Sequence, residues 1–150
     1  MLPQTYQIEV SKDGTLTFLL HFGRAGRLGR LVRANPKLTI VVDEVTALLA
    51  GPAADESRLE YRSVLARCDA ELSDDLDVLE AHQYQVLEKY RPKRDFADID
   101  RSWLKPIVAV RAVATEVTAK LRRLDDPRSH PGNYSRRELR VNEVAMRDGS

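Results

Sequence analysis

The residues best suited to chemistry in this chain are four arginines that recur at three-residue spacing between His21 and Pro36. They are Arg24, Arg27, Arg30 and Arg33, with no acidic residue among them. Gly23 and Gly26 leave the backbone accessible where the stretch begins. Free N–H groups and the positive end of a helix, beside guanidinium groups, suit a phosphate monoester. Spacing alone leaves a second interpretation open, in which the arginines form the solvated face of a connecting helix.

A short helix is expected to carry these arginines. Leu28, Leu31 and Val32 stand at positions i, i+3 and i+4, which is the spacing of a helix that buries one side. Asn35 followed by Pro36 is a typical helix end. The arginines would then lie on the exposed side.

A β-hairpin is predicted to lead into this helix. Residues 4–10 and 15–21 alternate between apolar and polar side chains, as half-buried strands do. The Asp13-Gly14 pair between them favours a tight turn. The hairpin would therefore deliver the basic stretch at the end of its second strand.

The rest of the chain predicts further strands around one long helix. After Pro36 we expect a buried strand over 38–42, a loop over 43–60, an alternating strand over 61–72 with Cys68 in the core, a helix capped by Ser73 and ending at Arg91, a helical turn over 97–104, and a long strand over 107–121. Within the loop, residues 45–50 could instead form a helical turn or an edge strand. Residues 1–124 would form one domain. Residues 125–150 would add a loop and a helix that starts at Ser135 and runs to about Met146.

These elements predict a mainly β fold of the α+β class. Five or six strands with two or three helices close most simply into a small antiparallel barrel with the helices at its periphery.

Composition restricts the class of partner. A net charge of +1 over 150 residues provides no general attraction to nucleic acid, so the four arginines are a local feature. No run approaches the ~20 apolar residues of a membrane span. The single cysteine, Cys68, excludes an internal disulfide and indicates a cytoplasmic protein. The three histidines have no metal-ligand spacing, so no metal site is expected.

Four stretches, taken in order, resemble a known family. They are Asp13-Gly14 with the strand over 15–21; Gly26-Arg27-Leu28 through Asn35-Pro36 to the strand over 38–43; Tyr61-Arg62-Ser63-Val64 with the helix ending in Glu88-Lys89-Tyr90; and Glu116-Val117-Thr118-Ala119-Lys120. Together they span residues 4 to about 123. They are similar to the FMN-binding split β-barrels related to pyridoxamine 5'-phosphate oxidase, in particular the small nitroimidazole-resistance branch.

The resemblance implies a homodimer that binds FMN between its subunits, with the flavin phosphate held where a strand passes into the first helix. Arg27 matches the arginine of the phosphate-binding segment, and His21 matches the position just before it. Arg62 and Ser63 match the strand pair that approaches the cofactor. On physical grounds Arg24 and Arg30 join this candidate set, because each lies about one turn from Arg27. A deazaflavin such as F420, or haem, stays open as the ligand.

Two departures from the family pattern bear on this site. Leu28 stands where relatives usually have a lysine, so one charge partner of the phosphate is missing unless Arg24 or Arg30 replaces it. Relatives also usually have a helix and a strand upstream of the segment that begins here at Pro3. Either the chain is truncated relative to them, or a partner supplies the strand, or the flavin site is degraded.

The leading functional hypothesis is a flavin-binding protein, and an FMN-dependent oxidoreductase if it is an enzyme. In such proteins the flavin performs the chemistry, and no general acid or base is indicated by the sequence. The alternative is a split-barrel relative that has lost FMN and serves as a binding or regulatory module. Nucleic-acid binding through the arginines is a third and weaker hypothesis. The sequence does not indicate the substrate or electron acceptor.

Overall fold

The computed structural model of the protein describes residues 4–123 and 135–138. The chain forms two compact units, which are considered separately. The first contains Met1–Ile40 and Ala66–Glu116, and the second contains Val41–Leu65 and Val117–Ser150. Three long strands contribute to both units: β3 (Lys37–Ala50), β4 (Arg58–Ser73) and β5 (Ile107–Arg122).

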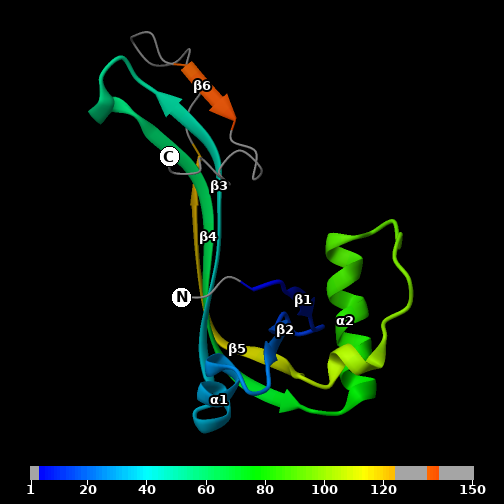
Figure 1. Cartoon of the computed structure of the whole chain (residues 1–150). Coiled ribbons are helices and arrows are strands. Elements are labelled where there is room, and N and C mark those ends of the chain that lie inside the picture. The colour runs from blue at the N-terminus through cyan, green and yellow to red at the C-terminus, as the bar shows by residue number, and fades with distance from the viewer. Residues whose placement is uncertain (1–3, 124–134, 139–150) are drawn as a thin grey trace. The chain divides into compact units, whose positions relative to one another are not determined.

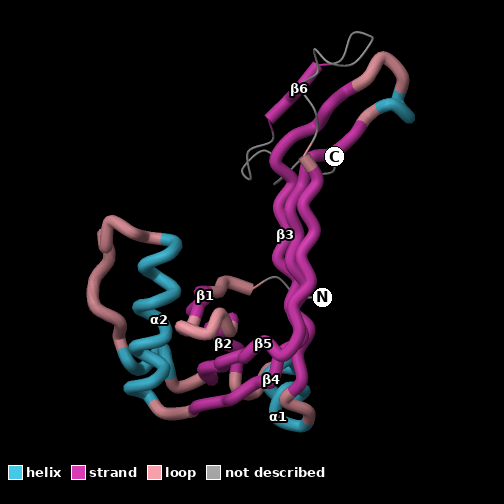
Figure 2. Tube along the Cα trace, turned by 180° about the vertical axis from the view of Figure 1, so that it is seen from behind, coloured by secondary structure: helices cyan, strands magenta, loops and turns pink. Residues whose placement is uncertain are grey.

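Strands are the main secondary structure of the described chain (Figures 1 and 2). Their hydrogen-bonded order is β1-β2-β5-β4-β3-β6, in which β1 is Gln7–Val10, β2 is Leu16–Gly23 and β6 is Ser135–Glu138. The pairs β1–β2, β2–β5 and β3–β6 are antiparallel. Two α-helices, α1 (Arg27–Ala34) and α2 (Leu76–Tyr90), and two 3₁₀ turns, η1 (Ala54–Glu56) and η2 (Arg101–Leu104), complete it. The predicted mainly β, α+β class with an antiparallel sheet is confirmed.

The predicted hairpin opens the first unit. Gly14 has φ +86°, and its N–H donates to the Ser11 carbonyl at 2.9 Å. Phe18, Leu19, Leu20 and Phe22 of β2 are all buried, so this strand is covered on both faces. Cys68 of β4 is also buried, and burial raises the pKa of its thiol. It is therefore a core side chain, as predicted.

The loop predicted over residues 43–60 is wrong except at 51–57, and the alternative of a strand over 45–50 is confirmed, as part of β3. Strand β3 continues to Ala50, and β4 already begins at Arg58. The charged pair Asp43-Glu44 resembles the end of a strand, but Glu44 forms an ion pair with Arg62 of β4 at 2.7 Å. A charged residue at an exposed position of a long strand therefore does not have to mark the end of the strand. Residues 38–42 alternate between half-buried and exposed and are not continuously buried.

Other corrections concern helix boundaries. Asp75, not Ser73, caps α2, because its carboxylate accepts the Asp77 N–H at 2.8 Å while Ser73 is the last residue of β4. Leu31 is 54% exposed, because α1 has only two turns and buries Gly29 and Val32. The helix predicted from Ser135 is wrong over 135–138, where β6 pairs with β3. Its remainder, over 139–146, lies outside the described residues.

Helix α2 packs on the core of the first unit through Leu79, His82 and Val86. Leu79 joins a buried cluster with Leu104 and Ala109. The spacing of these helix residues, three and four positions apart, places them on one face. None of the described helices is both long and apolar enough to cross a membrane.

His82 is the buried ionisable group on this face, with 4% of its surface exposed. Burial, and secondly the neighbouring His21, lower its pKa to about 4, against the opposing effect of a hydrogen bond to the Leu19 backbone. His82 is therefore neutral in the folded protein near pH 7. Its Nε2 has no hydrogen-bond partner in the described part of the chain.

Leu79→Ala should lower the free energy of unfolding by about 2–5 kcal/mol, because it leaves a cavity in a fully buried site. Leu31→Ala is the matched control, and it should cost less than about 1 kcal/mol because Leu31 is more than half exposed. Denaturant unfolding of both variants measures the difference. Equal losses would contradict this assignment of core and surface.

His82 should make the protein acid-sensitive. Its folded pKa lies below the unfolded value of 6.5, so the unfolded state binds more protons between those limits. The contribution is complete above pH 6.5 and is lost as pH falls towards 4, at a cost of about 3 kcal/mol. Unfolding free energies measured across this range should fall less steeply for His82→Leu. An unchanged slope would show that other groups cause the acid sensitivity.

Candidate functional site

The connection between β2 and α1 is a tight turn. The Arg24 N–H donates to the Pro106 carbonyl at 2.7 Å, and the Gly26 N–H donates to the Gly23 carbonyl at 2.9 Å. Helix α1 then begins at Arg27. The chain thus passes from a buried strand to an exposed helix start within three residues.

Gly29 allows the helix to lie against this turn. A Cβ atom at Gly29 would be 2.5 Å from the Gly23 carbonyl oxygen and 3.2 Å from that of Arg24. A Cβ at Gly26 would be 3.0 Å from the same Gly23 oxygen. The three-residue glycine spacing therefore serves close backbone packing, in addition to the accessibility expected at Gly23 and Gly26. Gly29 was not predicted from the sequence as a packing residue, although its position three residues after Gly26 continues the glycine spacing.

The N-terminus of α1 has no acidic partner of its own. Its N-cap is Gly26, which offers no side-chain hydrogen bond, and its first turn contains no Asp or Glu. The first N–H groups of a helix lack intrahelical acceptors and carry a partial positive charge. This end of α1 is therefore suited to an anion.

The four arginines around this turn have different surroundings. Arg24 and Arg33 share one carboxylate: Asp74 Oδ1 lies 3.3 Å from Arg24 Nε and 2.7 Å from Arg33 Nη2. Arg30 donates to the Ala25 carbonyl. The side chain of Arg27 is exposed and forms no hydrogen bond or ion pair within residues 4–123 and 135–138.

Asp74 is the site residue that the sequence did not reveal. A helix capped by Ser73 would have Asp74 in its first turn, but Asp74 precedes the Asp75 cap and pairs with arginines from a distant stretch. Its carboxylate fixes the two outer guanidinium groups and leaves Arg27 and Arg30 uncompensated by any described acidic side chain. The uncompensated positive charge is thus limited to Arg27 and Arg30, and not spread over all four arginines as their regular spacing indicated.

His21 lies on β2, opposite Ala109 of β5. It is half-buried, and its Nδ1 is buried without a hydrogen-bond partner among the described residues. Burial lowers its pKa, so the imidazole is neutral near pH 7. A neutral imidazole offers one donor and one acceptor, and an unpaired buried nitrogen is free to bond with a ligand.

The turn between β2 and α1, together with the first residues of α1 (residues 24–30), is called the arginine turn below. Arg62 and Ser63 belong to the second unit and are therefore considered apart from it. Arg62 Nε lies 2.7 Å from Glu44 Oε2, so its charge is compensated. Arg62 borders a small pocket of about 150 Å³, lined by Thr46, Glu60, Tyr61, Arg62, Leu121 and Arg123. Ser63 is half-buried on the same strand. The structure places Arg24 in the turn, three residues after His21, and Arg27 and Arg30 in the first turns of α1 that follow it.

A comparison with protein families identifies the chain over most of its length. The model of the pyridoxamine 5'-phosphate oxidase family matches residues 1–121. No match was found among curated proteins.

Solved structures with a similar fold include two larger proteins. The flavocytochrome Anf3 from Azotobacter vinelandii has a TM-score of 0.70 and 18% identity over 93% of this chain, which spans 66% of that protein. An FAD and heme binding protein from Mycobacterium smegmatis has a TM-score of 0.66 and 15% identity over 88% of this chain and 74% of its own.

A third similar structure comes from Bacteroides thetaiotaomicron, from a protein whose suggested role is 5-nitroimidazole antibiotic resistance. Its TM-score is 0.56, with 13% identity over 76% of this chain and 74% of that one. At such identities the likeness concerns the fold, and it confirms the split antiparallel β-barrel predicted from the sequence. With the match over residues 1–121, the chain belongs to the pyridoxamine 5'-phosphate oxidase family.

Proposed function

We propose that this protein binds a flavin, with FMN as the preferred form, by holding the flavin phosphate at the turn between β2 and α1. The observation that carries the proposal is Arg27, an exposed arginine without a described protein partner at an uncapped helix N-terminus. Two proteins of similar fold are a flavocytochrome and an FAD and heme binding protein, which supports a flavin as the ligand.

The residues of the turn fit a phosphate. Arg27 supplies charge-assisted hydrogen bonds, and the free N–H groups of the first turn of α1 supply further donors. Arg30 is the nearest additional cation in the helix and takes the place of the lysine that Leu28 replaces. Gly29 keeps the helix start close to the end of β2.

Arg24 and His21 have supporting roles in this proposal. Arg24 is tied to Asp74 and to the Pro106 and Ile107 carbonyls, so it orients the turn as much as it attracts the phosphate. His21 offers a neutral, unpaired nitrogen for a hydrogen bond to the ligand. A bound flavin supplies hydride or electron transfer at its ring, while the protein contributes binding and orientation.

Arg27→Ala should weaken FMN binding by about 1.5–3 kcal/mol, the range for a hydrogen bond to a charged group. Titration followed by flavin absorbance or fluorescence measures the affinity. Riboflavin lacks the phosphate, so its weaker binding should be the same for wild type and variant. Arg58→Ala, which removes an exposed arginine from β4, is the matched charge control.

Three outcomes separate the hypotheses. An equal loss for FMN and riboflavin would mean that Arg27 does not contact the phosphate. Unchanged FMN affinity would place the phosphate elsewhere. Failure of the wild-type protein to bind FMN, FAD or riboflavin would sink the flavin proposal and favour a binding or regulatory module that has lost the cofactor.

We further propose that the protein is a homodimer. The strands of the second unit expose large apolar side chains, namely Val41, Leu59, Leu65, Val117 and Leu121. Leu59 and Leu65 have the same parity on β4 and so share one face of it. Exposed large apolar side chains gathered on the strands of one unit are typical of interfaces, and a second copy of the chain would bury them.

Leu65→Arg should shift the protein from dimer to monomer, because it places a charge in the apolar interface. Sedimentation at several concentrations measures the change in mass. Leu31→Arg, on α1, is the control at another exposed leucine and should leave the mass unchanged. A monomeric wild-type protein, or a dimeric Leu65→Arg variant, would contradict the proposal.

A further inference from the structure

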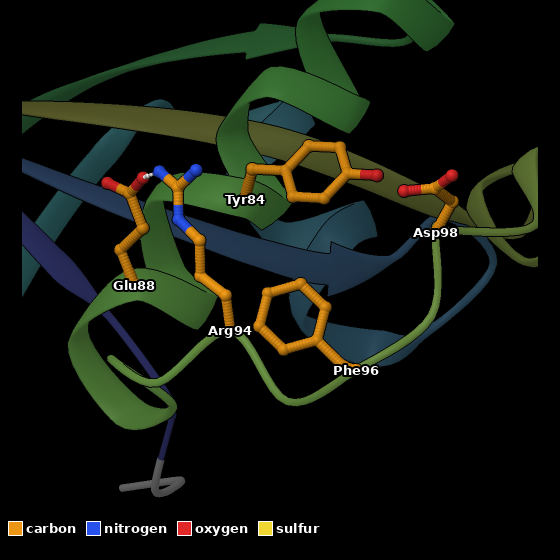
Figure 3. Close-up of a pocket in the computed structure, with 5 residues that line it drawn as sticks. All are labelled: Tyr84, Glu88, Arg94, Phe96 and Asp98. Carbon is orange, nitrogen blue, oxygen red and sulfur yellow. Dashed lines mark hydrogen bonds and ion pairs between the residues drawn. The ribbon is translucent and has the colours of Figure 1, made fainter.

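A pocket outside the arginine turn lies between α2 and the segment that follows it. Its volume is about 380 Å³, and its lining consists of Tyr84, Glu88, Arg94, Phe96 and Asp98 (Figure 3). All five residues belong to the first unit. The volume is within the range of about 300–1,000 Å³ that is typical of small-molecule sites.

Two aromatic rings form the centre of this pocket. The Tyr84 and Phe96 ring centroids are 6.4 Å apart, with an angle of 30° between the planes. In Figure 3 the rings lie between the Glu88–Arg94 pair on one side and Asp98 on the other. The faces of such rings carry partial negative charge and attract cations.

The charged residues of the pocket leave one carboxylate uncompensated. Arg94 forms an ion pair with Glu88, so these two charges cancel. Asp98 is exposed and makes no hydrogen bond or ion pair within the part of the chain that the structure describes. The pocket therefore has a net charge of about −1, which repels anions and attracts cations.

Phe96 already contacts a cation of the chain itself. The Arg91 Cζ atom lies 5.3 Å from the Phe96 ring centroid. This distance is within the ~6 Å limit of a cation–π contact. Arg91 also forms an ion pair with Asp95, with 3.1 Å between Nη2 and Oδ1. The Phe96 ring therefore attracts a cation, and because Asp95 compensates the Arg91 charge, this guanidinium leaves the net negative charge of the pocket unchanged.

The pocket walls are fixed by the rest of the unit. The Tyr84 hydroxyl accepts a hydrogen bond from the Ile99 N–H at 3.3 Å, and Ile99 packs on the buried cluster around Leu79. Arg94 has φ +52°, a left-handed conformation that is rare for a non-glycine residue, and its N–H donates to the Arg91 carbonyl at 3.0 Å. The turn over residues 91–94 is thus formed before any ligand binds, which reduces the entropy cost of binding.

We propose that this pocket binds a small organic cation, an ammonium or quaternary ammonium group on a short carbon chain. The Tyr84 and Phe96 rings contact the cation, and Asp98 provides the opposite charge. The Glu88–Arg94 ion pair closes the other side. The proposal is independent of flavin binding, because it uses none of the residues of the arginine turn.

Choline and its uncharged carbon isostere 3,3-dimethylbutan-1-ol are the matched probes, since they differ in the charged nitrogen and hardly in shape. Titration into the full-length protein, followed by the NMR signals of the Tyr84 and Phe96 rings, should give at least about tenfold tighter binding of choline. Equal binding of the two probes, or no shift of these ring signals with choline, would overturn the proposal.

Asp98→Asn removes the charge with little change in shape, and it should weaken choline binding about five- to tenfold. Phe96→Leu should weaken it about threefold or more, because an aliphatic side chain lacks the ring's negative face. Asp55→Asn, at an exposed aspartate outside the pocket, is the control and should have no effect. Unaltered choline affinity in Asp98→Asn would overturn the assigned role, while FMN affinity should be the same in all three variants.

Discussion

The arginine turn depends on one backbone contact, the approach of Gly29 to the Gly23 carbonyl. There is no space for a Cβ atom between Gly29 and this carbonyl oxygen. The close approach holds the N-terminus of α1 beside the end of β2, which is a buried strand. Val32, one turn further along the same buried side of α1, packs into the core and anchors the helix there. A helix displaced by even a methyl group would move its first N–H groups and Arg27 together, since both belong to one rigid turn.

Charge then distinguishes arginines that look equivalent in the sequence. Asp74 binds the first and last of the four, so these act as supports of the turn. An arginine already paired with a carboxylate gains less from an incoming anion than an unpaired one, because the anion must replace an existing partner. In the proposed flavin site, the contact with the phosphate would therefore fall mainly on Arg27, with Arg30 beside it.

Local sequence patterns predict much of this fold. The rest depends on pairing between residues far apart in the chain. The Asp13-Gly14 hairpin, the basic helix and two of the three long strands, β4 and β5, follow from turn chemistry and periodicity, which act over a few residues. Sequence reasoning failed where a distant partner decides the outcome. Glu44 lies within β3 and forms an ion pair with Arg62 of β4, and residues 135–138 pair with β3 despite a helix-capping pattern. Asp74 could not be connected with the arginines, because nothing local fixes how the end of β4 meets α1.

The aromatic pocket illustrates the same limit on a helix. The core face of α2 carries Leu79, His82 and Val86, and the pocket uses Tyr84 and Glu88, which are four residues apart on another face. Apolar spacing reports the first face only. The second becomes a pocket because Ile99 is tied both to the Tyr84 hydroxyl and to the core cluster. Burial of one face of α2 thus determines the geometry of the other, so the pocket depends on the core as much as on its own lining.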